Sequence, residues 1–149
     1  MASGLHETFL GLLEFELLLQ LDGIRARGDV LGLFAAGIRP TRSKTLTWKS
    51  EEDGRIIRHS PDGSYCHDRA EYPGVIIEAS YSQKRKDLSG LAEDYILESN
   101  SSIQLVVGID FDYRGSKEAV ILMWRPRWVI SDQDGEMELI SEQVLREVR

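Results

Sequence analysis

Residues 74–81 read GVIIEASY, and this stretch decides the fold because apolar side chains occupy both of its faces. Such a pattern is typical of a central strand that other elements cover on both sides. Side chains alternate along a strand, so Glu78 shares one face with Ile76 and Ser80. A carboxylate inside such a strand is costly to bury unless a cation, a metal ion or nearby solvent compensates its charge. The stretch therefore predicts a central strand with a polar site on one face.

A helix and a second strand are predicted directly after this stretch. Between residues 87 and 98, apolar side chains recur at helical spacing and form one face, at Leu88, Leu91, Ala92, Tyr95 and Ile96. Residues 103–111 are again strongly apolar and predict a strand. The order strand, helix, strand predicts a βαβ unit with two parallel strands.

The flanking segments complete an α/β or α+β pattern around one central mixed sheet flanked by helices. Residues 6–21 predict a helix that is apolar on nearly all sides and is therefore either buried or covered by a partner. Residues 30–36 predict a short helix, and residues 136–148 fit a strand, a helix or both. Further strands are predicted at residues 45–49, 55–59, 64–67 and 119–124, the last of them ended by Arg125-Pro126.

The length of 149 residues predicts a single domain, 1–149, with an N-terminal helical part over 1–44 and a sheet core over 45–149. The single cysteine, Cys66, excludes an intramolecular disulfide and fits a reducing compartment. The most apolar run, residues 9–21, is too short to span a membrane, and the segment before it lacks the basic residues of a signal peptide. We therefore expect an intracellular protein, cytoplasmic or nuclear, that is neither secreted nor embedded in a membrane.

The charge is acidic overall but unevenly distributed. A formal net charge of −7 argues against a large nonspecific nucleic-acid surface, which needs Lys and Arg. Asp29 is the one acidic residue among six basic residues between positions 24 and 49, which are Arg25, Arg27, Arg39, Arg42, Lys44 and Lys49. A second basic cluster is Lys84-Arg85-Lys86. These clusters are candidate contacts to a phosphate backbone, and they equally fit solvated loops.

Two carboxylates are candidates for a metal site. Asp62 lies in a turn at the start of a predicted strand, and a hairpin of that strand with the central one would bring Asp62 to Glu78. Two convergent carboxylates suit Mg²⁺ or Mn²⁺, which activates a water molecule and offsets charge on a phosphodiester. Asp68 is a competing ligand. The ordinary alternatives are a turn residue for Asp62 and a structural ion pair for Glu78.

The residues around these carboxylates carry a resemblance to a known family. Pro61-Asp62, then residues 73–80 (PGVIIEAS), a helix and a strand resemble the metal-binding core of the PD-(D/E)XK nuclease superfamily, which has a restriction-endonuclease-like fold. The chain also resembles a group of fungal members of this superfamily, at residues 81–84 (YSQK), Leu88, Asp94-Tyr95, 106–109 (VVGI) and 124–126 (WRP). The similarity covers most of the chain after Thr45. It implies a divalent-metal-dependent nuclease acting on DNA or RNA, with Asp62 and Glu78 as the metal ligands.

One position departs from the pattern of this superfamily. Its lysine is expected two residues after the glutamate, where this chain has Ser80, which supplies no positive charge. The resemblance implies that a relocated side chain takes over this role, and the candidates are Gln83, Lys84 and Lys86. It also implies an acid on the first helix, for which Glu14 and Glu16 are candidates.

Three functions follow from these residues. Asp62 and Glu78 favour a nuclease in which Gln83 or Lys84 assists catalysis. Ser80 and the acidic net charge favour a catalytically silent module of the same fold, used for binding or assembly. The third function is that of an unrelated α+β interaction protein, in which the apolar first helix forms a homodimer surface.

Overall fold

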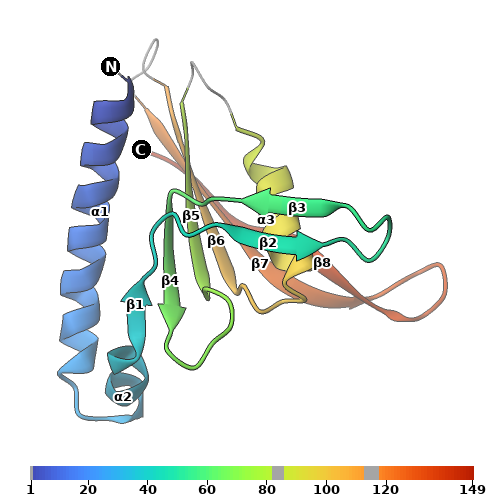
Figure 1. The fold of residues 1–149 in the computed structure, drawn as a ribbon, viewed down its shortest axis with the longest axis horizontal. Helices are drawn as coiled ribbons and strands as arrows, with labels where there is room; N and C mark the ends of the chain where they lie inside the picture. Colours follow the sequence, from blue (N-terminus) through green and yellow to red (C-terminus); the bar gives the residue numbers. More distant parts are fainter. Residues whose placement is uncertain (1, 82–85, 113–117) are drawn as a thin grey trace.

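The structure is a computed structural model that describes residues 2–81, 86–112 and 118–149, and within them the fold is α+β (Figure 1). The helices are α1 (Ala2–Arg25), α2 (Val30–Ala36) and α3 (Leu88–Glu98). The main mixed sheet has the order β1 (Ile38–Pro40), β4 (Gly63–His67), β5 (Val75–Tyr81), β6 (Leu105–Phe111), β7 (Ala119–Ile130) and β8 (Met137–Val148). A separate antiparallel hairpin consists of β2 (Leu46–Lys49) and β3 (Ile56–His59).

The strand β5 lies inside the sheet, as its two apolar faces predict. It pairs antiparallel with β4 and parallel with β6, where Glu78 lies opposite Gly108. The helix α3 connects β5 to β6, so the predicted βαβ unit with parallel strands is confirmed. This helix begins after Asp87, whose side chain accepts a hydrogen bond from the backbone N–H of Gly90 and so caps its first turn.

Each face of the sheet has its own apolar core. On the Glu78 face, Ile76 belongs to a buried cluster with Tyr95 and Ile96 of α3 and with residues of the β2–β3 hairpin. On the opposite face, Ile77 belongs to a cluster with residues of α1, including Leu13. Figure 1 shows α1 on one side of the sheet, and α3 with the hairpin on the other. The polar site on the Glu78 face therefore lies between the sheet and α3.

The N-terminal part differs from the prediction in two ways. The helix α1 extends beyond residues 6–21 at both ends. At its C-terminal end, the guanidinium of Arg25 donates to the backbone carbonyls of Ala35 and Ile38 and holds the last turn in place. The prediction that residues 1–44 are a helical part beside the sheet is also incomplete, because β1 pairs antiparallel with β4 inside the main sheet. Residues this far upstream carried no strand pattern, so only tertiary pairing reveals β1.

The C-terminal strands are longer than predicted. The prediction that Arg125-Pro126 ends a strand is wrong, since β7 continues to Ile130. Beyond Trp124, β7 pairs with β8 alone among the described residues, and a strand paired on one side accommodates a proline that lacks an N–H. Residues 136–148 fit a strand, a helix or both by sequence, and in the structure Met137–Val148 form the long strand β8.

The first helix packs within the chain on one side only. Its residues Phe9, Leu10 and Leu13 join the core under the sheet, whereas Leu12 and Phe15 are 65% and 63% exposed. Exposed apolar side chains of this size are consistent with an interface. No helix in the described part of the chain is both long and apolar enough to cross a membrane.

Candidate functional site

Strand pairing brings the two predicted carboxylates together. In the antiparallel pair of β4 and β5, Gly63 lies opposite Ile77, so Asp62, one residue earlier, falls opposite Glu78. The backbone N–H of Ala79 donates to Oδ2 of Asp62 at 2.7 Å, which holds the Asp62 side chain against β5. The turn at Asp62 therefore delivers a carboxylate to the central strand, as the predicted hairpin required.

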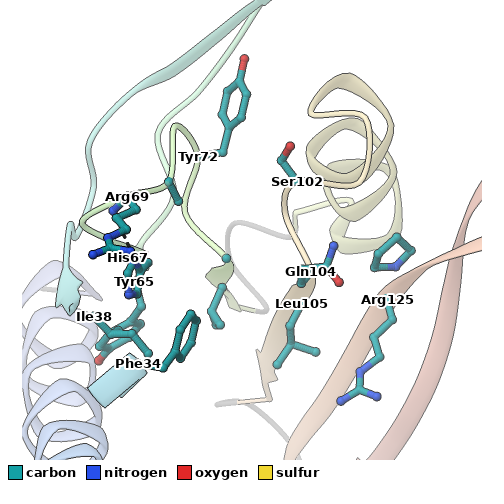
Figure 2. Close-up of a pocket in the computed structure, with 14 residues that line it drawn as sticks. Phe34, Ile38, Tyr65, His67, Arg69, Tyr72, Ser102, Gln104, Leu105 and Arg125 are labelled. Carbon is teal, nitrogen blue, oxygen red and sulfur yellow. Dashed lines mark hydrogen bonds between the residues drawn. The ribbon is translucent and has the colours of Figure 1, made fainter. Parts of the chain in front are cut away.

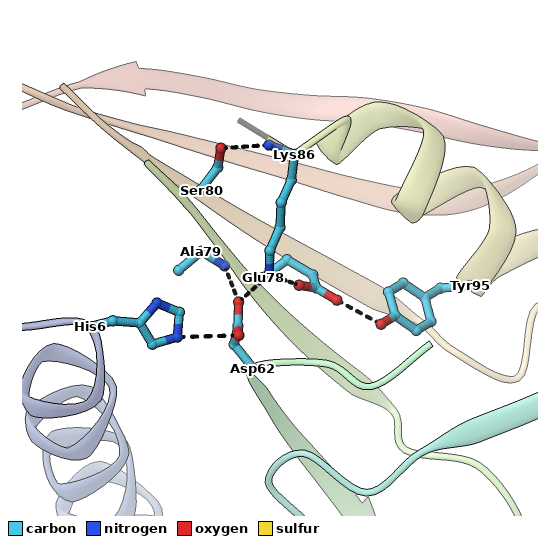
Figure 3. Close-up of polar contacts among 7 residues, drawn as sticks. All are labelled: His6, Asp62, Glu78, Ala79, Ser80, Lys86 and Tyr95. Carbon is cyan, nitrogen blue, oxygen red and sulfur yellow. Dashed lines mark hydrogen bonds and ion pairs between the residues drawn. The ribbon is translucent and has the colours of Figure 1, made fainter. Parts of the chain in front are cut away.

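Lys86 connects the two carboxylates. Its Nζ lies 2.6 Å from Oδ2 of Asp62 and 2.7 Å from Oε2 of Glu78 (Figure 3). Because both oxygens contact one nitrogen atom, the two carboxylates face one shared point. Of the three candidates for the relocated lysine, Gln83 and Lys84 lie outside the described residues, and Lys86 is the one that the structure brings to the site.

Ser80 has a structural part in this arrangement. The backbone N–H of Lys86 donates to Oγ of Ser80 at 3.0 Å. The residue at the position where the superfamily pattern expects lysine therefore anchors the backbone of the lysine that does reach the carboxylates. Ser80 and Lys86 are six residues apart because Ser80 lies near the end of β5 and Lys86 lies just before the start of α3.

Two further side chains complete the hydrogen bonding of the carboxylates. The hydroxyl of Tyr95 on α3 donates to Oε1 of Glu78 at 2.6 Å. The Nε2 atom of His6 on α1 lies 3.2 Å from Oδ1 of Asp62 (Figure 3). Tyr95 was predicted on the apolar face of its helix, which faces β5, and a tyrosine there needs a partner for its hydroxyl. No pattern in the sequence pointed to His6.

The electrostatics follow from burial. Glu78 is 3% exposed, and burial raises the pKa of its carboxyl even though hydrogen bonds from Lys86 and Tyr95 act to lower it. Burial alone would lower the pKa of Lys86, but hydrogen bonds and charge interactions with Asp62 and Glu78 outweigh it and raise that pKa. Burial, together with the charge of Glu78, also raises the pKa of Tyr95. Lys86 and Tyr95 therefore both keep their protons at neutral pH and act as donors.

Neither candidate for a first-helix acid joins this site. Glu14 and Asp62 both line a cavity of about 310 Å³ beside α1, but the Glu14 carboxylate is bound by Arg42, with Nη2 at 3.1 Å. Glu16 is exposed and accepts a hydrogen bond from Gln20. The competing ligand Asp68 contacts His67 at the far end of β4.

The donor set fits Mg²⁺ or Mn²⁺ in chemical type. Asp62 and Glu78 offer hard carboxylate oxygens, and Mg²⁺ is commonly held by one or two carboxylates with water in the remaining positions. Among the residues that the structure describes, no group of three or more His, Cys, Asp or Glu side chains is arranged to hold a metal ion. An ion at this site would therefore be held by two carboxylates, and Lys86 would have to move away from the point between them.

The basic cluster near the N-terminus is partly neutralised. Arg25, Arg27 and Arg42 form ion pairs with Asp22, Asp29 and Glu14, respectively. The other three members, Arg39, Lys44 and Lys49, form no ion pair within the described ranges. These three remain the candidates for phosphate contacts from this cluster.

Comparisons with protein-family models, with curated proteins and with solved structures found no match to this chain. The residues of the site and their geometry are therefore the basis for a functional proposal.

Proposed function

We propose that the protein is a divalent-metal-dependent nuclease that hydrolyses phosphodiester bonds of DNA or RNA, within the PD-(D/E)XK superfamily that its sequence resembles. The observation that carries this proposal is the contact of Lys86 Nζ with both Asp62 and Glu78. It supports a lysine relocated from position 80 to position 86, which answers the main departure from the superfamily pattern. Asp62 and Glu78 would hold Mg²⁺ or Mn²⁺.

Each side chain has a part in this proposal that follows from its contacts. The bound ion would supply an activated water molecule and offset negative charge on the phosphate. Lys86 keeps its ammonium charge beside the carboxylates, and once it has moved aside for the ion it is suited to stabilise charge that develops on a phosphate oxygen. Tyr95 and the backbone N–H of Ala79 fix the orientations of Glu78 and Asp62. His6 acts on the other oxygen of Asp62, as a positioning residue.

A second function, a catalytically silent module for binding or assembly, is favoured by a different observation. All four carboxylate oxygens of Asp62 and Glu78 already contact a donor or a basic nitrogen from Lys86, Tyr95, Ala79 or His6. An ion-pair network this complete is also what a structural role would produce. The net charge of −7 adds to this alternative, because it opposes binding to a long polyanion.

Metal binding and cleavage, measured on the same variants, separate the two functions. Mn²⁺ binding is measured by calorimetry on the wild type, on Glu78→Gln and on the matched control Glu138→Gln, which changes an exposed carboxylate on β8. Cleavage of plasmid DNA and of RNA is then measured with Mg²⁺ and with Mn²⁺. For a nuclease, the wild type and Glu138→Gln bind Mn²⁺ and cleave, and Glu78→Gln does neither.

The other results point elsewhere. A wild type that binds no Mn²⁺ at millimolar concentration contradicts the nuclease proposal. Mn²⁺ binding that depends on Glu78, without cleavage of either substrate, supports the silent module. Cleavage by Glu78→Gln at the wild-type rate shows a contaminating nuclease and also counts against the proposal.

We also propose that the exposed apolar side of α1 pairs with a second copy of the chain. Leu12 and Phe15 carry this proposal, with Leu19 one turn further along at 50% exposure. Light scattering after size exclusion tests it, with a dimer expected for the wild type and a monomer for Phe15→Glu. The matched control Trp128→Glu changes an exposed aromatic residue on β7 and keeps the dimer. A wild type that is still monomeric at a concentration of about 100 µM contradicts this proposal.

A further inference from the structure

A second cavity lies at the start of β5, where it is lined by Val75, whereas Glu78 of the carboxylate site lies in the middle of that strand. Its volume is about 710 Å³, which is within the range of pockets that enclose small ligands. The floor includes Val75 and Leu105, the first residues of the parallel strands β5 and β6. Figure 2 shows Phe34 and Arg69 on one side of this cavity, and Gln104 and Arg125 on the other.

The charge of this cavity contrasts with that of the whole protein. Arg69, Arg125 and His67 line it, and no Asp or Glu is among the lining residues. Both arginines are exposed, and neither forms an ion pair with any residue in the described ranges. In a chain with a net charge of −7, two arginines without an ion pair to a described residue, one on each side of the cavity, point to an anionic ligand.

One wall of the cavity is flat and aromatic. The rings of Phe34 and His67 are stacked, with centroids 4.6 Å apart and an interplanar angle of 15°. This stack holds the Phe34 ring in place while 57% of the residue stays exposed. A supported, exposed ring is a surface on which another flat ring can stack, as nucleobases do on aromatic side chains.

We propose that this cavity binds one nucleotide unit, with its base against the Phe34 ring and its phosphate at the arginines that line the cavity, Arg69 and Arg125. A nucleotide combines the two properties that the cavity selects, a flat ring and a compact anion, and the planar guanidinium group matches a phosphate in geometry. The ligand is either a free mononucleotide or the terminal unit of a nucleic-acid strand. The inference goes beyond the proposed function and does not depend on chemistry at Asp62 and Glu78.

Calorimetry in EDTA tests the cavity separately from any metal-dependent activity. The probes are adenosine monophosphate, adenosine and inorganic phosphate, and the nucleotide is expected to bind more tightly than either fragment. Arg69→Gln and Arg125→Gln each weaken nucleotide binding by about tenfold, the order of loss for one charged hydrogen bond at an exposed site. The matched control Arg58→Gln, an exposed arginine on β3, leaves binding unchanged. Phe34→Leu weakens binding of the nucleotide but not of phosphate.

Two results would overturn the inference. One is no detectable binding of adenosine monophosphate at millimolar concentration. The other is binding that neither arginine variant weakens, which would locate the nucleotide elsewhere. A 5′-phosphorylated oligonucleotide distinguishes the two ligand sources, since tighter binding than the free nucleotide supports a strand terminus and equal or weaker binding supports a free mononucleotide.

Discussion

Replacing Lys86 with methionine tests the ion pair at the centre of the site. Methionine keeps an unbranched apolar stem but removes the ammonium, so two carboxylates are left facing the same space. Removing one partner of a buried ion pair costs about 3–5 kcal/mol. Glu78 is 3% exposed, whereas the side chains of Asp62 and Lys86 are 17% and 28% exposed, so water reaches part of the pair. We therefore expect a loss of about 3 kcal/mol in the free energy of unfolding, since partial hydration keeps the cost at the low end of that range.

Guanidinium unfolding followed by tryptophan fluorescence measures this loss in EDTA at pH 7.5. For a chain of 149 residues, a loss of this size lowers the melting temperature by roughly 6–12 °C. The matched control Lys44→Met changes an exposed lysine without an ion pair to any described residue and should cost less than about 0.5 kcal/mol. The double variant Lys86→Met/Glu78→Gln should be more stable than Lys86→Met alone, because one uncompensated charge is gone.

Adding Mn²⁺ extends the same test to the proposed metal site. If Asp62 and Glu78 hold an ion, Mn²⁺ replaces the lost counter-charge and stabilises Lys86→Met more than the wild type. At a concentration one hundred times the dissociation constant, binding adds about 2.7 kcal/mol. A cost below about 1 kcal/mol for Lys86→Met, the value for an exposed ion pair, would refute the reasoning about burial. Equal effects of Mn²⁺ on both proteins would refute the shared site.

Three further outcomes are expected from equilibrium unfolding. Tyr95→Phe removes the buried hydrogen bond to Glu78 and should cost about 1.5–3 kcal/mol, whereas a cost near zero would show that Lys86 alone holds this carboxylate. Gly108→Ala should cost about 1–3 kcal/mol because a Cβ there would meet a buried tryptophan ring at 2.9 Å, whereas Gly23→Ala, with open space around it in α1, should be neutral or stabilising. The folded state raises the pKa of Lys86, so its contribution is complete below the ordinary lysine value of 10.5 and is lost as pH rises beyond it. Unfolding midpoints of the wild type and of Lys86→Met should therefore run parallel up to about pH 10.5, and between there and about pH 12 the wild type should fall more steeply. Curves that stay parallel over the whole range would contradict the shift.

The sequence predicted the centre of the fold better than its edges. The strands β5 and β6 carry apolar residues on both faces because both faces are covered. The helix α3 carries them along one face because that face is buried. The edge strand β1 has only three residues and one partner, so it needs no such pattern. A similar reason explains β7, where Pro126 marks an end by local rules but lies in the stretch that pairs with β8 and no longer with β6.

The site was predictable in part. The sequence singles out Asp62 as a turn residue at the start of a strand and Glu78 as a charge inside an apolar strand. Pairing of β4 with β5 in a hairpin then brings these two residues, which are separated in sequence, into proximity. His6 carries no anomaly of its own, since a histidine near a chain terminus fits an exposed helix equally well. Its contact with Asp62 depends on where α1 lies against the sheet.

The sequence by itself determined the parallel β5–α3–β6 unit and the pairing of two carboxylates at its edge, because alternation, helical spacing and turn chemistry act between near neighbours. Only the tertiary structure decided which cation meets those carboxylates. Lys86 reaches them because Ser80 holds its backbone and because α3 and the turn at Asp62 enclose the same space. That choice depends on the joint position of three segments and on the reach of one side chain, and no spacing along the chain encodes either.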